Sequence, residues 1–260
     1  MMDIAAVFAG FLTGAIVGMT GVGGGAIMTP ILILLLGVAP QTAVGTDLLF
    51  ATITKLVAVS VHRSRGTIDW QIVRRLALGS IPAACLTLLL MFKFSGIRDV
   101  GSVIMPALGI ALVITSVAMI FRKTLHGFAK HWRISTPVSF KRVQPVLTVL
   151  AGVLLGVMIT VTSIGAGALG AVMLVYLYPL RLTPAKLVGT DLAHAIPVAL
   201  VAGLGHLALG NVNFGLLGWL LIGSLPGVWL GARASLAAPE SVVRYGIAVI
   251  LLIVGIRILA

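Results

Sequence analysis

Long apolar segments alternate with short polar breaks along the whole chain, which is the pattern of helices that cross a membrane. About 20 consecutive apolar residues are enough for a helix to span the hydrocarbon core. Segments of this kind are predicted near 40–61, 70–91, 100–121, 184–207, 214–236 and 242–259. We therefore expect an all-α polytopic membrane protein.

A glycine-rich run interrupts a further apolar segment in each half. The segment near 4–19 is followed by Thr20-Gly21-Val22-Gly23-Gly24-Gly25 and a short arm near 26–36. The segment near 146–161 is followed by Thr162-Ser163-Ile164-Gly165-Ala166-Gly167 and an arm near 168–178. At ~1.5 Å per residue, such an arm covers about half of the ~30 Å core. The pattern predicts a broken or re-entrant helical hairpin in each half.

The second half of the chain repeats the first. Val44-Gly45-Thr46-Asp47-Leu48 recurs as Val188-Gly189-Thr190-Asp191-Leu192, and Gly79-Ser80-Ile81-Pro82 recurs at the same spacing as Gly223-Ser224-Leu225-Pro226. Self-similarity of this kind indicates a duplication. We expect a first transmembrane repeat at 1–121, a basic cytoplasmic linker at 122–145 and a second transmembrane repeat at 146–260. Each repeat would place three transmembrane helices beside its hairpin.

Composition supports a membrane location. Hydrophobic residues make up 60% of the chain and charged residues 9%, whereas soluble domains carry about 25% charged residues. The net charge of +12 does not predict nucleic-acid binding, because most Lys and Arg lie in short loops between apolar segments. Cys85, the single cysteine, lies in an apolar segment. This excludes an intrachain disulfide and a cysteine-based metal cluster, and no metal or cofactor is expected.

The distribution of charge favours repeats of opposite orientation. If the second repeat is inverted, one side of the membrane receives the loops 62–75, 122–145, 181–186 and 233–244. These loops hold most of the 18 Lys and Arg, and a parallel arrangement would divide the charge more evenly. Because cytoplasmic loops are enriched in Lys and Arg, we expect inverted repeats with both termini in the periplasm.

The glycine runs are candidate substrate sites. Glycine permits close approach of the backbone, and free N–H groups at the start of a helical arm bind anions. Packing of neighbouring helices is the alternative role, but duplication beside short arms favours binding. The candidates in the first run are Thr20, Gly21, Gly23, Gly24 and Gly25, and in the second Thr162, Ser163, Gly165 and Gly167.

The Gly-Thr-Asp motifs add Thr46 and Asp47, and Thr190 and Asp191, to the candidates. An ionisable residue inside a membrane segment is a functional candidate. Three roles remain open for the aspartates: a proton-coupling carboxylate, a cation ligand, or an N-cap of a helix broken at Gly45-Thr46 and Gly189-Thr190.

Other polar residues are accessory candidates. Lys55 is expected either to attract an anion within the cavity or, more in keeping with its position, to snorkel towards the cytoplasm. His194 follows Asp191 on one helical face and suits a packed, hydrogen-bonded role better than a proton relay. His62 and His206 are expected to cap helices or contact lipid headgroups, and most of the Trp and Tyr residues to anchor at the interface.

Two alternatives to a transporter are an anion channel and an intramembrane aspartyl protease with one aspartate on each of two helices. The protease requires Gly-x-Gly-Asp, where this chain has Val44-Gly45-Thr46-Asp47. A continuous pore suits paired broken helices less well than alternating access does. A secondary transporter, not an enzyme, is the favoured interpretation.

With these motifs in place, the chain resembles the sulfite exporter TauE/SafE family. The resemblance covers nearly the whole chain apart from 122–144. It rests on the first glycine run, both Gly-Thr motifs, His62-Arg63-Ser64-Arg65-Gly66-Thr67-Ile68-Asp69, Gly223-Ser224-Leu225-Pro226-Gly227 and Leu230-Gly231-Ala232-Arg233.

The resemblance implies a homodimeric carrier in the bacterial inner membrane that exports sulfite or sulfonates such as sulfoacetate. It also implies that residues around both glycine runs and both Gly-Thr-Asp motifs contact the anion.

Overall fold

The computed structural model describes residues 2–20, 25–64, 66–94, 101–135, 137–165, 167–234 and 240–260, and within them it is helical with no strand. The first half contributes α1 (Met2–Thr20), α2 (Gly25–Leu34), α3 (Pro40–Ser64), α4 (Trp70–Phe94) and α5 (Gly101–Ile120). The helix α6 (Arg122–Ser135) leads to the second half, which contributes α7 (Pro137–Thr162), α8 (Ala168–Leu177), α9 (Pro184–Ala208), α10 (Phe214–Ala234) and α11 (Glu240–Leu259). The prediction of an all-helical membrane protein is confirmed.

The helices follow the predicted apolar segments closely, with one difference. The stretch interpreted as a linker is itself helical, since it contains α6 and the first turns of α7. Helix α7 begins at Pro137, so the predicted boundary between linker and second repeat at 145/146 lies inside this helix. Each helix of the first half has a counterpart in the second, and α3 and α9 both begin at a proline, which is favoured in the first helical turn.

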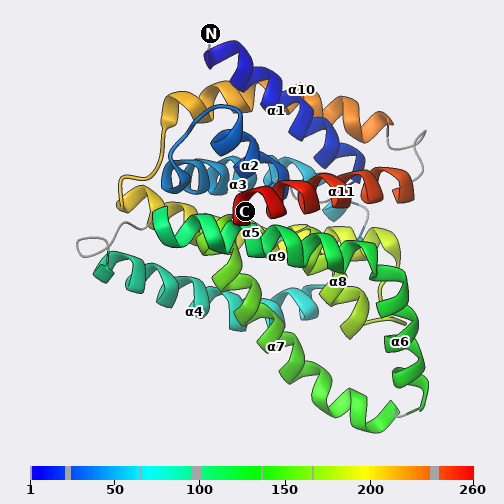
Figure 1. Ribbon diagram of the computed structural model, residues 1–260. Coiled ribbons are helices and arrows are strands. Elements are labelled where there is room, and N and C mark those ends of the chain that lie inside the picture. The colour runs from blue at the N-terminus through cyan, green and yellow to red at the C-terminus, as the bar shows by residue number, and fades with distance from the viewer. Residues whose placement is uncertain are drawn as a thin grey trace.

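Among the described residues, four helices of each half pack against helices of the other half. In Figure 1, α1 lies beside α10 and α5 beside α11, while α4 packs against α7 and α3 against α9. The contact of α1 with α10 is thus the counterpart of the contact of α7 with α4. Each half therefore supplies surfaces that the other half completes, so neither can be packed alone.

Glycines allow these crossings to be close. A Cβ placed on Gly79 of α4 would collide with the carbonyl oxygen of Val149, and one on Gly223 of α10 would collide with that of Val7. Gly10 and Gly152 make the reciprocal approaches to the carbonyl oxygens of Leu220 and Leu76. Small residues of this kind let helix backbones approach each other in membranes. The two halves therefore share these close glycine contacts as well as their sequence motifs.

Equivalent hydrogen bonds join the ends of α3 and α9. The Asp69 N–H donates to the Thr190 hydroxyl oxygen over 3.0 Å, and the Asn213 N–H donates to that of Thr46 over 3.0 Å. The start of each helix therefore lies next to the residues that follow the other, so α3 and α9 run antiparallel.

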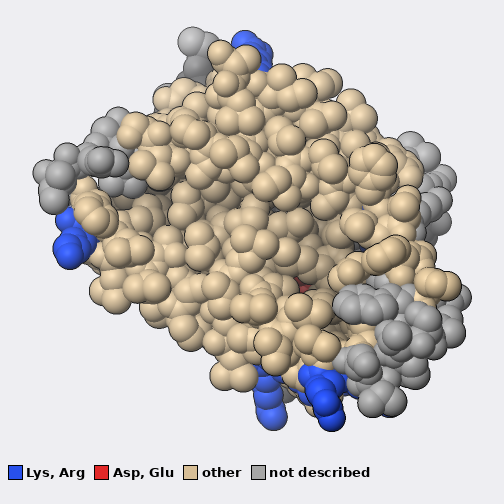
Figure 2. All heavy atoms as spheres, turned by 60° about the horizontal axis from the view of Figure 1, so that its bottom comes forward, with Lys and Arg blue, Asp and Glu red and all other residues tan. Residues whose placement is uncertain are grey.

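The outer surface suits a lipid environment. Large apolar side chains are exposed along α4, α5, α7, α10 and α11. Figure 2 shows one nearly uncharged face with Lys and Arg at its margins. Five helices among the described residues have the length and composition to cross a membrane. The structure is therefore that of a multi-pass membrane protein.

The glycine crossings give a stability prediction. Gly79→Ala or Gly223→Ala should destabilise the protein by about 1–3 kcal/mol, because backbone atoms cannot move aside as a flexible side chain can. Thermal unfolding in detergent would measure the loss as a lower Tm. Gly218→Ala is the matched control, since its Cβ would meet nothing within 4 Å. Equal effects of all three substitutions would contradict the packing role.

Candidate functional site

The chain breaks between α7 and α8, as the second glycine run predicts. Ser163, Gly165 and Gly167 have φ angles of 59°, 135° and 101°. Glycine adopts positive φ without the steric cost that a side chain brings, so the last two positions suit glycine. Ser163 is a serine in the left-handed region, which is uncommon for a residue other than glycine and marks a site of local strain.

The first glycine run is described only at its two ends. Helix α1 ends at Thr20 and α2 begins at Gly25, close to the positions equivalent to the end of α7 and the start of α8. The candidate residues Gly21, Gly23 and Gly24 and the side chain of Thr20 lie outside the described residues. The detailed geometry of the site therefore comes from the second half.

Thr162 stabilises the break through its hydroxyl group. Its hydroxyl donates to the carbonyl oxygen of Met158 over 2.7 Å and accepts the N–H of Ile164 over 3.1 Å. The Gly170 N–H closes the turn by donating to the Gly165 carbonyl oxygen over 2.7 Å. These bonds satisfy backbone groups that would otherwise be unpaired at the broken ends.

The carboxylate of Asp191 lies at the N-terminal end of α8. The backbone N–H of Gly167, the N-cap residue of α8, donates to this carboxylate. A Cβ on Gly170 would collide with its Oδ1 atom. A negative charge is stabilised at a helix N-terminus. The place where the sequence predicts a bound anion is thus held by a carboxylate of the chain itself.

Asp47 makes the corresponding approach to α2. Its Oδ2 atom accepts a hydrogen bond of 2.6 Å from the Thr29 hydroxyl, and Ser163 of the other half lies near the carboxylate without being hydrogen-bonded to it. The Oδ1 atoms of Asp47 and Asp191 and the Ser163 Oγ atom are buried and lack a hydrogen-bond partner within the described structure. Buried polar atoms without partners are rare, and here three of them belong to the predicted site.

Lys55 completes the site. Only 3% of its surface is exposed, and its charge interacts with both Asp191 and Asp47. The expectation that Lys55 snorkels to the cytoplasmic end is therefore wrong. The reason is that two carboxylates stabilise its charge in the interior, where an unpaired ammonium group would be very costly. We call Asp47, Lys55, Ser163 and Asp191 the central polar cluster.

The capping role considered for the Gly-Thr-Asp motifs is wrong. Helices α3 and α9 run unbroken through both motifs. Their glycines permit close approach instead, since a Cβ on Gly189 would collide with the backbone of Thr67. Thr46 and Thr190 accept hydrogen bonds from the opposite half, as described above, so both threonines join the repeats.

Two histidines, His194 and His206, have structural hydrogen bonds. His194 is buried, and its Nε2 atom lies 2.9 Å from the Ser80 hydroxyl, which agrees with the predicted packed role. His206 is also buried and donates to the Thr160 carbonyl oxygen over 2.9 Å, so the expected contact with headgroups is wrong. The His62 side chain lies outside the described residues.

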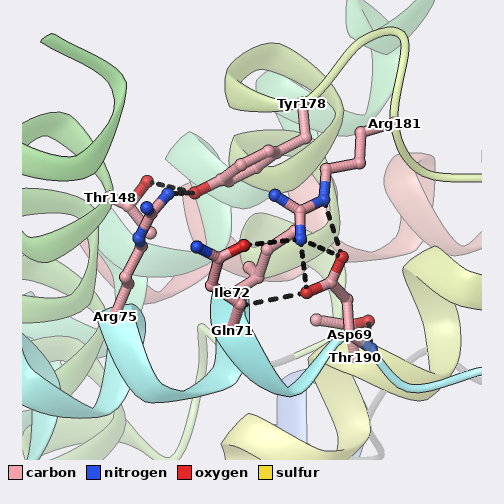
Figure 3. Close-up of polar contacts among 8 residues, drawn as sticks. All are labelled: Asp69, Gln71, Ile72, Arg75, Thr148, Tyr178, Arg181 and Thr190. Carbon is pink, nitrogen blue, oxygen red and sulfur yellow. Dashed lines mark hydrogen bonds and ion pairs between the residues drawn. The ribbon is translucent and has the colours of Figure 1, made fainter. Parts of the chain in front are cut away.

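A second polar region, which the sequence analysis did not single out, surrounds a surface pocket of about 430 Å³ between α4, α7 and the loop after α8. Figure 3 shows Arg181 forming two hydrogen bonds with Asp69, of 2.7 and 2.9 Å, and a third with Gln71 of 2.8 Å. Tyr178 lies beside Arg181 and is hydrogen-bonded to Thr148 and Arg75. It is buried, so the expectation of an interfacial anchor is wrong for this tyrosine.

Comparison with known proteins identifies the family. Residues 6–258 match the family described as "Sulfite exporter TauE/SafE". The chain is 36% identical over 261 residues to the probable membrane transporter protein YjnA of Bacillus subtilis (strain 168), covering 99% of this chain and 100% of that protein. It is 26% identical over 256 residues to the probable membrane transporter protein YdhB of the same organism, covering 96% and 97%.

A probable membrane transporter protein of Haemophilus influenzae (strain ATCC 51907 / DSM 11121 / KW20 / Rd) is 24% identical over 272 residues, which cover 95% of this chain and 94% of that protein. No solved structure matches the chain. The match to the family spans both repeats and both glycine runs, and the prediction from the motifs is confirmed. The chain belongs to the sulfite exporter TauE/SafE family and is a membrane transporter.

Proposed function

We propose that this transporter exports sulfite or a small organic sulfonate such as sulfoacetate across the bacterial inner membrane by alternating access. The observation that carries the proposal is the broken segment between α7 and α8, where a helix N-terminus meets the central polar cluster. Discontinuous helices with N-termini facing an anionic group are a recurring form of transporter substrate site. The name of the family supports the sulfur-containing substrate.

The resident carboxylate suggests how the substrate binds. The Gly167 N–H holds Asp191 in the structure described here. A sulfite or sulfonate oxygen would take the place of the carboxylate at this N–H and accept a further hydrogen bond from the Ser163 hydroxyl. Lys55 supplies the positive charge that the incoming anion needs in a medium of low dielectric constant. Substrate and Asp191 therefore compete for one donor.

We propose that the two halves cross the membrane in opposite directions. The antiparallel contact of α3 with α9 supports this arrangement, as does that of α5 with α11, in which Gly109 lies against Leu259 and the Ser116 hydroxyl donates to the Ala248 carbonyl oxygen. The loop charges favour the cytoplasm for α6 and the periplasm for both termini. Equivalent broken helices would then approach the substrate from opposite sides.

Transport in proteoliposomes tests the substrate class. Vesicles that contain the purified chain should accumulate radiolabelled sulfite or sulfoacetate faster than empty vesicles, and unlabelled substrate should compete. Uptake should saturate, because each transport cycle carries a bound anion. Flux that rises linearly with concentration, together with single-channel conductance, would contradict the carrier mechanism and favour a channel.

Substitutions in the central polar cluster test the binding mode. Lys55→Gln should weaken sulfite binding by about tenfold or more, because a charge-assisted hydrogen bond contributes about 1.5–3 kcal/mol. Asp191→Asn should instead strengthen binding, because the anion then displaces a neutral amide. Calorimetric titration of the purified variants measures both effects.

Asp69→Asn is the matched control for these substitutions and should leave binding unchanged, because the equivalent position in the second half is Asn213. Weaker binding in both Lys55→Gln and Asp191→Asn would contradict competition with the carboxylate.

Cysteine labelling tests the orientation of the repeats. Gln71 and Gly215 are exposed and occupy equivalent positions near the starts of α4 and α10. In a Cys85→Ser background, Gln71→Cys should react with a membrane-impermeant maleimide from the cytoplasmic side, and Gly215→Cys from the periplasmic side. Labelling of both from one side would refute inversion without affecting the proposal of anion transport.

A further inference from the structure

The pocket between α4, α7 and the loop after α8 is lined by more cationic than acidic residues. Three cationic residues, Arg75, Lys141 and Arg181, line it, and no acidic residue is among its lining residues. Arg181 is neutralised by the nearby Asp69, to which it is paired through two hydrogen bonds. Arg75 and Lys141 therefore leave the pocket with an excess of positive charge.

The second copy of the repeat lacks these charges. Asn213 replaces Asp69 and still accepts the N–H of the helix it precedes, as Asp69 accepts that of Ile72. Trp219 stands where the first half has Arg75, and the segment Leu35–Ala39, which corresponds to the loop after α8, carries no charge. The starts of α4 and α10 thus keep the same cap, while the cationic residues of the pocket lie beside α4.

The pocket also has an apolar part. Pro145, Pro179 and Leu180 are among its lining residues, and Leu180 is 59% exposed. A ligand in this position would meet both cationic and apolar side chains.

We propose that this pocket binds the phosphate group of an anionic phospholipid such as phosphatidylglycerol. Basic pockets between membrane helices bind lipid headgroups in this way. The phosphate contacts Arg75 and Lys141, and the acyl chains leave the pocket past the exposed Leu180. Gln144 and Tyr178 are held by hydrogen bonds to Leu177 and Thr148, so the wall of the pocket is formed before the lipid arrives. Free sulfite has no apolar part to match the exposed side chain of Leu180.

Native mass spectrometry of the purified full chain tests the proposal. After delipidation, the protein is titrated with phosphatidylglycerol or with phosphatidylcholine of the same acyl composition. Phosphatidylglycerol should bind more tightly, and Lys141→Gln should weaken its binding by about fivefold, with a further factor of about five for Arg75→Gln. Lys141 is exposed, so the single variant retains the fold even if the double variant does not.

Arg142→Gln is the matched control, because Arg142 is the exposed neighbour of Lys141 but does not line the pocket. It should leave the affinity for phosphatidylglycerol within twofold of the unchanged chain. Equal loss in Arg142→Gln and Lys141→Gln would overturn the proposal, as would equal binding of the two lipids. Displacement of phosphatidylglycerol by millimolar inorganic phosphate or sulfite would also overturn it and assign the pocket to a free oxyanion.

Discussion

The structure depends on stabilising charged side chains that are buried in the interior of a membrane protein, away from water. A buried carboxylate or ammonium group is tolerated only when opposite charges and hydrogen bonds replace its hydration. Here Lys55 interacts with two carboxylates, one from each half, while Thr29 and the start of α8 supply hydrogen bonds to them. The crossing of α3 and α9 brings these groups together, so the fold and the candidate site rest on the same contacts.

The length of the apolar segments was sufficient to predict most of the helices. The segments predicted from 40 and 184 begin where α3 and α9 begin, and the second glycine run marks the break before α8. The helical character of 122–145 was missed because its polar sequence lacks the apolar run that identified the other segments. The sequence showed that Lys and Arg are concentrated in 122–145, but it could not show that this region continues directly into a membrane helix.

The sequence identified candidate residues for the site, but it did not show which of them contact one another. Lys55 and Asp191 are far apart in sequence, so no local spacing indicates that their charges interact. The same holds for Asp47 and Ser163, which come from different halves. Tyr178 resembles an interfacial anchor until Thr148 and Arg75 are placed beside its hydroxyl group. Tertiary contacts decide these roles, and a hydropathy pattern carries no information about them.

The glycine crossings have a consequence for how the transporter moves. Gly79 and Gly152 hold α4 against α7, and Gly10 and Gly223 hold α1 against α10, with backbone touching backbone. Each closely packed pair takes one helix from each half, so a movement of one repeat against the other as a rigid body would have to separate these backbones. If transport proceeds by the alternating access proposed above, the mixed pairs α4–α7 and α1–α10 are the units expected to move together.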